Sequence, residues 1–253
     1  MNVEINTDDQ IVLSTIHPLR SLFSVALWAI AILVLAQVIL GLVFNIFYDA
    51  TQGADYSVSE TDNGIHSLPI LLTLSLFSTL ISFPLLLKAS PGTKWTEHFE
   101  FWAIKGINRQ ELFRWSLVIL VFWLFSSLMD EVLHLPVEPF MLEIKASGDS
   151  IGVIFLAILS ICIIGPIFEE IIFRGWMFSK IAQTKLGSVG ALLITTLIFT
   201  LLHSQYEQVL TYFVIGSLGF LLGFIRYRIN NISYTIIAHM LFNSASMIAL
   251  FLS

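Results

Sequence analysis

Residues 151–182 read IGVIFLAILSICIIGPIFEEIIFRGWMFSKIA, an apolar stretch that contains four charged residues. A membrane-spanning helix needs about 20 mostly apolar residues. Lipid offers the backbone no hydrogen-bond partners, so a helix is the expected structure. Ionisable side chains are costly inside a membrane and are candidates for function wherever they occur there. This stretch therefore predicts a helical membrane fold and the position of a site within it.

The composition of the whole chain agrees with this prediction. Of its 253 residues, 57% are hydrophobic and 12% are charged, against about 25% charged residues in soluble domains. This composition excludes a disordered chain, a nucleic-acid-binding protein and an ordinary cytosolic enzyme. Further apolar stretches lie at about residues 21–48, 67–87, 112–129, 189–203, 209–225 and 232–252.

We therefore expect an all-α, polytopic transmembrane bundle of about seven to eight spans. The chain is expected to form one transmembrane domain, with variable spans in residues 1–149 and a functional core in residues 150–253. The first apolar stretch is too long for the core of a signal peptide, so we interpret it as a membrane anchor. The single cysteine, Cys162, excludes an intramolecular disulfide and is expected to be a buried thiol.

The basic residues indicate an orientation. Eleven of the 12 fall in loops on one side of the predicted bundle or beside them, and only Lys145 falls on the other side. The positive-inside rule makes the first side cytoplasmic. We expect a multi-pass protein of the cell membrane whose site is accessible from the cytoplasm. Within residues 91–110, Trp95, Phe99 and Trp102 favour a loop in the aromatic belt, with an interfacial helix as the alternative.

Spacing predicts which polar side chains share a helix face. Residues at i and i+4 are neighbours on a helix, so Glu170 can pair with Arg174. Glu169 points about 100° away and has no local partner. His239 and Asn243 also lie four residues apart and should project together. The expectation for the first pair, taken alone, is a structural ion pair, and Asn243 alone could join two helices.

Whether these polar side chains can contact one another depends on their depth in the membrane. If the fourth span ended at Phe168, Glu169 and His203 would lie on opposite sides of the bilayer. If one helix instead continues through residue 182 and turns at about 183–188, both residues lie 17 positions from residue 186. An antiparallel hairpin then places them at equal depth. We therefore predict the long helix, with Glu169, His203, His239 and Asn243 at one level.

Three other features of these helices have structural interpretations. Phe173 and Phe199 are expected to serve in packing. The spacing of Gly216, Gly219 and Gly223 predicts close contact between helices, without a catalytic role.

Three motifs then indicate a family. Glu-Glu-Ile-Ile-Phe-Arg at 169–174, Phe-Thr-Leu-Leu-His at 199–203 and His-Met-Leu-Phe-Asn at 239–243 resemble the motifs of the CPBP family. That family groups type II CAAX prenyl endopeptidases with bacteriocin-processing and immunity proteins. The resemblance covers about residues 150–253.

The resemblance implies an intramembrane endopeptidase acting on a membrane-associated or prenylated peptide. Glu169 would activate a water molecule and His203 would hold it, while His239 and Asn243 would stabilise the oxyanion. Glu170 and Arg174 would orient these groups. The resemblance favours a glutamate-dependent reaction without a cofactor. The alternative is zinc bound by Glu169, His203 and His239.

Two other classes of function stay open at this point. The first is a non-catalytic immunity or scaffold protein that binds a peptide or a partner protein. The second is a small transporter, although no pair of matching half-repeats is evident in the sequence.

Overall fold

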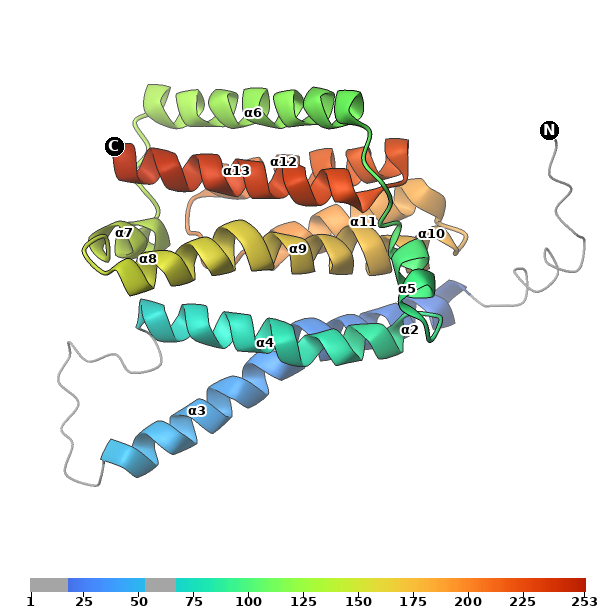
Figure 1. Cartoon of the computed structure of the whole chain (residues 1–253), viewed down its shortest axis with the longest axis horizontal. Coiled ribbons are helices and arrows are strands. Elements are labelled where there is room, and N and C mark those ends of the chain that lie inside the picture. The colour runs from blue at the N-terminus through green and yellow to red at the C-terminus, as the bar shows by residue number, and fades with distance from the viewer. Residues whose placement is uncertain (1–17, 53–66) are drawn as a thin grey trace, which may run out of the picture.

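A computed structural model describes residues 18–52 and 67–253, and these residues form a bundle of helices without strands (Figure 1). The elements are α2 (Pro18–Ile30), η1 (Ala31–Leu35), α3 (Ala36–Gln52), α4 (Leu68–Ala89), α5 (Trp95–Trp102), α6 (Arg109–Val132), α7 (Pro139–Ala146), α8 (Ile151–Ala157), η3 (Ile158–Ile164), α9 (Gly165–Glu170), η4 (Ile171–Met177), α10 (Phe178–Ala182), α11 (Gly187–Leu201), α12 (Val209–Ile229) and α13 (Ile232–Leu252). The η segments are π-helical.

Six helical segments within the described residues are long and apolar enough to cross a membrane. They are Leu22–Ile46, Leu68–Ala89, Arg109–Val132, Ile151–Ala182, Val209–Ile229 and Ile232–Leu252. The predicted span at 189–203 corresponds to α11, which is apolar but has only 15 residues. The chain is a multi-pass helical membrane protein, as its composition predicted. Residues 1–17 and 53–66, and expectations for them, lie outside the described part.

The helix predicted to continue through residue 182 does so. Ile151–Ala182 forms one uninterrupted span, and α11 begins after a short turn at Gly187. The π-helical segments η3 and η4 flank α9 within this span, and π-helical turns occur frequently at functional sites. Gly165 is required between η3 and α9, because a Cβ atom there would lie 2.4 Å from the Ser160 carbonyl oxygen.

Close packing of α11 against α12 depends on the three glycines of α12. A Cβ atom added at Gly219 would lie 3.0 Å from Cδ1 of Phe199, and one at Gly223 would lie 2.6 Å from Cδ1 of Leu192. The predicted helix contact is therefore confirmed. Phe199 is fully buried by this contact.

The prediction of a loop for residues 91–110 was wrong in part, because this segment contains the helix α5. The Glu97 carboxylate accepts hydrogen bonds from the backbone N–H groups of Thr93 and Lys94, at 2.7 and 3.1 Å. These two bonds cap the helix and hold the pKa of Glu97 below its ordinary value. Trp102 is fully buried and donates to the Ser90 hydroxyl at 2.8 Å. Capping and aromatic burial together stabilise a helix that hydropathy alone did not indicate.

The early spans and the later ones share a hydrophobic cluster. Leu86 of α4, Trp102 of α5 and Trp176 of η4 are fully buried within it, and Val25 of α2 also belongs to it. The proposed division between residues 1–149 and 150–253 stays a prediction.

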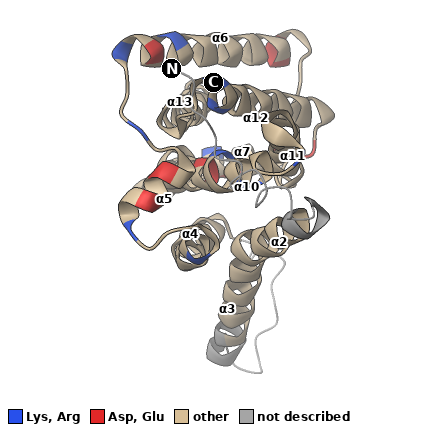
Figure 2. Ribbon diagram, turned by 90° about the vertical axis from the view of Figure 1, so that its right-hand side faces the viewer, with Lys and Arg blue, Asp and Glu red and all other residues tan. Residues whose placement is uncertain are grey.

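Most of the described basic residues lie at one end of the bundle, which we call the basic end and onto which Figure 2 looks. They are Lys88 at the C-terminal end of α4, Lys94 and Lys105 on either side of α5, Arg109 and Arg114 at the beginning of α6, Lys180 and Lys185 near the turn between α10 and α11, and Arg226 and Arg228 in the last turn of α12. Lys145 lies on α7, outside the basic end. That the basic end faces the cytoplasm stays a prediction.

A buried ion pair lies in the middle of the bundle. Arg174 Nη1 donates to Glu170 Oε1 at 2.8 Å, and both side chains have an exposed fraction of 0%. The second guanidinium nitrogen donates to the Gly219 carbonyl oxygen at 2.9 Å. The guanidinium also lies 4.3 Å from the centroid of the Phe199 ring. The predicted i, i+4 pair is confirmed, and it connects η4 to α11 and α12.

This geometry gives a stability prediction with an internal control. Removing one partner of a buried ion pair leaves an uncompensated charge, which costs about 3–5 kcal/mol. We expect Arg174→Gln to lower the free energy of unfolding in detergent by that amount. The control is Arg114→Gln, which breaks a pair of similar length, 2.9 Å to Glu111, in which the Arg114 side chain is 67% exposed. That change should cost about 1 kcal/mol or less. Equal losses in the two variants would contradict the prediction.

Candidate functional site

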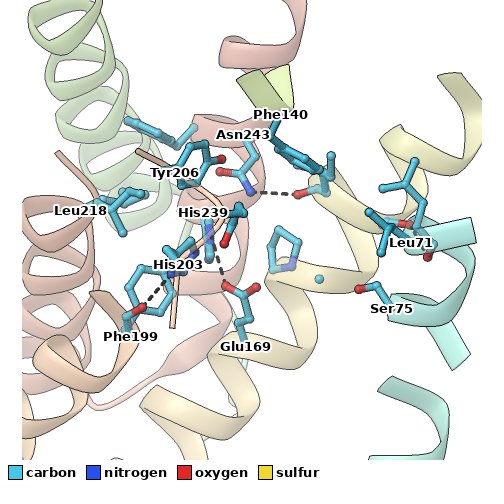
Figure 3. Close-up of a pocket in the computed structure, with 18 residues that line it drawn as sticks. Leu71, Ser75, Phe140, Glu169, Phe199, His203, Tyr206, Leu218, His239 and Asn243 are labelled. Carbon is cyan, nitrogen blue, oxygen red and sulfur yellow. Dashed lines mark hydrogen bonds and ion pairs between the residues drawn. The ribbon is translucent and has the colours of Figure 1, made fainter. Parts of the chain in front are cut away.

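A cavity of about 310 Å³ lies in the middle of the bundle, between α4, α9, α12 and α13 (Figure 3). Its volume is at the lower end of the range for ligand pockets, about 300–1,000 Å³. Its polar lining consists of Ser75, Ser160, Glu169, His203, Gln205, Tyr206, His239 and Asn243. The structure thus brings the four predicted catalytic residues into one cavity. Glu170 and Arg174 do not line it and lie buried behind it.

Glu169 presents its carboxylate to this cavity. Its side chain is 34% exposed, whereas the neighbouring Glu170 is fully buried. Glu169 Oε2 lies 3.9 Å from Nε2 of His239. The spacing of residues along its own helix predicted no partner for Glu169, and the structure places one, His239, on α13. Figure 3 shows the Glu169 and His239 side chains pointing toward each other.

His239 connects the two glutamates. Its Nδ1 lies 3.1 Å from Glu170 Oε1, the same oxygen that Arg174 binds. A carboxylate held by an arginine only accepts hydrogen bonds, so Nδ1 of His239 carries a proton. The other nitrogen, Nε2, then faces Glu169 and the cavity. The ring is 2% exposed, so its orientation is fixed by this contact.

His203 follows the C-terminal end of α11. Its Nδ1 lies 2.7 Å from the Phe199 carbonyl oxygen. A carbonyl oxygen accepts, so Nδ1 is the donor and Nε2 is free to accept a hydrogen bond in the neutral ring. The Phe199 ring centroid lies 4.5 Å from the His203 ring and 5.8 Å from the His239 ring. Phe199 is a packing residue, as expected, and its ring contacts both histidines.

Asn243 lines the cavity from α13. Its amide nitrogen donates to the Ile161 carbonyl oxygen in η3 at 2.8 Å. A side-chain amide has two N–H groups, so a second donor is left for a ligand. The bond to Ile161 also agrees with the alternative that Asn243 joins two helices.

A zinc site would need several His, Cys, Asp or Glu side chains arranged around one point. Within residues 18–52 and 67–253, no group of three or more His, Cys, Asp and Glu side chains is placed to hold a metal ion. Glu169, His203 and His239 line the same cavity but do not form a three-ligand metal site in this arrangement.

Two residues of the site, Tyr206 and Glu138, were missed by sequence reasoning. Tyr206 lines the cavity, with its ring stacked at 6.4 Å on His203 and packed edge-to-face against Phe140. Glu138 is buried and accepts hydrogen bonds from the backbone N–H groups of Glu207 and Gln208, at 3.0 and 3.2 Å. It thereby holds the loop that carries His203. A tyrosine and a glutamate in predicted loops are ordinary, so nothing in the sequence marked them.

Comparison with known proteins finds similarity in the second half of the chain. Residues 150–245 match the family model described as "Type II CAAX prenyl endopeptidase Rce1-like". The chain is 35% identical over 115 residues to the "Uncharacterized 24.3 kDa protein" of Escherichia coli, covering 45% of this chain and 52% of that protein. It is 34% identical over 100 residues to the "Putative membrane peptidase YdiL" of Bacillus subtilis (strain 168), covering 40% of this chain and 39% of that protein.

The matched segments span about half, or less, of each of these relatives. No solved structure matches the chain. The family match contains all three motifs, and hence all six residues that the sequence singled out. Residues 150–245 of this chain are therefore similar to the type II CAAX prenyl endopeptidase Rce1-like family.

Proposed function

We propose that this protein is an intramembrane endopeptidase that hydrolyses a peptide bond with a water molecule activated by Glu169. The observation that carries the proposal is the shared cavity, which the partly exposed Glu169 lines together with His203, His239 and Asn243. The family of residues 150–245 and the name of the Bacillus subtilis relative support the same class of reaction.

The first step of the proposed reaction uses Glu169 as a general base. A water molecule between Glu169 and His203 donates one proton to the carboxylate and a hydrogen bond to Nε2 of His203. Its oxygen attacks the peptide carbonyl carbon, and the carbonyl oxygen becomes an oxyanion. Glu169 then returns the proton to the leaving amine as the carbon–nitrogen bond breaks.

Stabilisation of the oxyanion is assigned to His239 and Asn243. Nε2 of a protonated His239 donates one hydrogen bond, and the free N–H of Asn243 donates a second. Such preorganised donors are worth about 10²–10³-fold in rate each. Glu170 holds Nδ1 of His239 at 3.1 Å and is itself fixed by Arg174. Glu170 and Arg174 are therefore positioning residues in this proposal.

The walls of the cavity support our proposal for the substrate class. Apolar side chains from three separate helices, Leu71 of α4, Phe140 of α7 and Leu218 of α12, line it together with the polar groups. An apolar wall beside a hydrolytic centre fits a membrane-associated peptide, or a peptide carrying a prenyl group. We propose that such a substrate reaches the site from the cytoplasmic side of the cell membrane.

The central prediction concerns Glu169→Gln. The amide keeps the size of the side chain but cannot accept the proton from water, so peptide hydrolysis should be lost. The measurement compares membrane peptides, by mass spectrometry, in cells carrying the wild-type protein or the variant, and an uncut substrate should accumulate in the variant. The control is Glu143→Gln, which makes the same change on an exposed residue of α7. Identical peptide profiles for wild type and Glu169→Gln would contradict the proposal.

A second experiment separates hydrolysis from binding alone. If the protein acts as an immunity or scaffold protein, its cellular effect should survive both Glu169→Ala and His203→Ala. If it is a peptidase, either change should remove that effect. Complementation of a deletion strain by the two variants measures this directly, with wild-type expression levels confirmed for each.

The proposed chemistry needs no metal ion, which gives a further prediction. Strong chelators should leave hydrolysis by the purified protein unchanged, because Glu169 and its neighbours activate the water themselves. The measurement is the cleavage rate of the substrate found above, before and after dialysis against chelator. Loss of activity that added zinc restores would reject the metal-independent reaction and favour Glu169, His203 and His239 as ligands.

A further inference from the structure

A second cavity, of about 410 Å³, lies at the basic end of the bundle. It is lined by residues of α5, α10, the C-terminal end of α12 and the beginning of α11, and we call it the basic-end cavity. Its polar lining includes Glu100, Ser179, Gln183, Ser188, Arg226 and Asn230. None of the residues that line it also lines the site of Glu169.

Arg226 is the distinctive residue of this cavity. Only 6% of it is exposed. It donates from Nε to the Arg174 carbonyl oxygen at 2.8 Å, from Nη2 to the Ser179 hydroxyl at 3.2 Å, and from Nη1 to the Asn230 amide oxygen. These three bonds leave two of the five guanidinium N–H groups for another acceptor.

The charge of Arg226 has no carboxylate partner within residues 18–52 and 67–253. Among the residues that the structure describes, no Asp or Glu oxygen lies within 4 Å of its guanidinium nitrogens, although Arg174 has Glu170 at 2.8 Å. Glu100 lines the same cavity, but it is exposed and forms no ion pair with Arg226. In the part of the chain that the structure describes, this largely buried guanidinium bonds to neutral oxygens. That arrangement favours binding of an anion, because a buried charge is costly unless it is paired.

Two further features beside Arg226 contribute positive potential near the cavity. Ser188 lies in the first turn of the 15-residue helix α11 and lines the cavity. A helix N-terminus carries a partial positive charge and unpaired N–H groups, both of which favour anions. The ammonium group of Lys180 lies 5.4 Å from the ring centroid of Phe101, another lining residue.

We propose that the basic-end cavity binds a phosphate group, and that this is the headgroup phosphate of a membrane phospholipid. The planar guanidinium of Arg226 matches two oxygens of a phosphate group. The cavity lies where the apolar spans α4 and α12 end, which is the level of lipid headgroups. Basic pockets between membrane helices bind such headgroups. Free inorganic phosphate has the same chemistry, and the experiment below distinguishes the two sources.

The test uses the full-length protein, purified and stripped of lipid in a non-ionic detergent. Phosphatidylglycerol, inorganic phosphate and uncharged diacylglycerol are added separately, and retained ligand is measured by native mass spectrometry. We expect phosphatidylglycerol to be retained and diacylglycerol not, because only the former carries phosphate. Binding of inorganic phosphate at equal strength would identify free phosphate as the source. Equal retention of diacylglycerol and phosphatidylglycerol would overturn the proposal.

Variants connect the binding to this cavity. Arg226→Gln should weaken phosphatidylglycerol binding by about tenfold or more, since a hydrogen bond to a charged group contributes about 1.5–3 kcal/mol. The matched control is Arg228→Gln, which removes an exposed arginine two residues away that does not line the cavity. Binding of phosphatidylglycerol by the Arg228→Gln protein should stay at the wild-type level. An equal loss in both variants would mean that overall charge, and not the cavity, retains the lipid.

A further variant keeps the test decisive if Arg226→Gln does not fold. Ser188→Asp places a negative charge in the first turn of α11, where carboxylates stabilise helices. The fold should therefore be retained while the added charge repels phosphate from the cavity. We expect phosphatidylglycerol binding to fall by about tenfold, as for the loss of one charge-assisted bond. Wild-type binding by a folded Ser188→Asp protein would overturn the assignment.

Discussion

The buried ion pair between Glu170 and Arg174 is the interaction on which the candidate site depends. Both side chains are fully buried, and each compensates the charge of the other in a medium without water. Consecutive helix residues point about 100° apart. Once Glu170 is turned inward to Arg174, Glu169 is directed into the cavity. The orientation of the carboxylate that can act on water is therefore set by the pair beside it.

The same pair organises the neighbouring helices. Glu170 fixes His239 of α13, and Arg174 binds the Gly219 carbonyl of α12 and lies over the ring of Phe199 in α11. Nε of Arg226, near the C-terminal end of α12, donates to the backbone carbonyl oxygen of Arg174. One ion pair thus sets the relative positions of the elements that carry Glu169 and both histidines. The absence of a side chain at Gly219 is part of this arrangement, since it lets Phe199 and Arg174 approach α12.

Much of the fold and the core of the site followed from patterns that are local in the sequence. Hydropathy predicted the helical bundle, and the spacing of four residues predicted the Glu170–Arg174 pair. Counting residues from a turn near 186 predicted that Glu169 and His203 share one level, and both line the same cavity. Local patterns failed for α5, because its stability comes from the capping by Glu97 and the burial of Trp102. Those contributions depend on geometry that hydropathy does not measure.

The sequence by itself determined that the chain is a helical membrane protein and which few polar residues lie within its helices. Only the tertiary structure decided what each of them contacts: His239 between two glutamates, Asn243 on the Ile161 carbonyl, and His203 beside Tyr206 in a loop held by Glu138. It also enclosed Arg226 without a carboxylate partner among the described residues. The physical reason is that spacing fixes neighbours along one helix, whereas contacts between helices depend on their rotation, depth and side-chain packing.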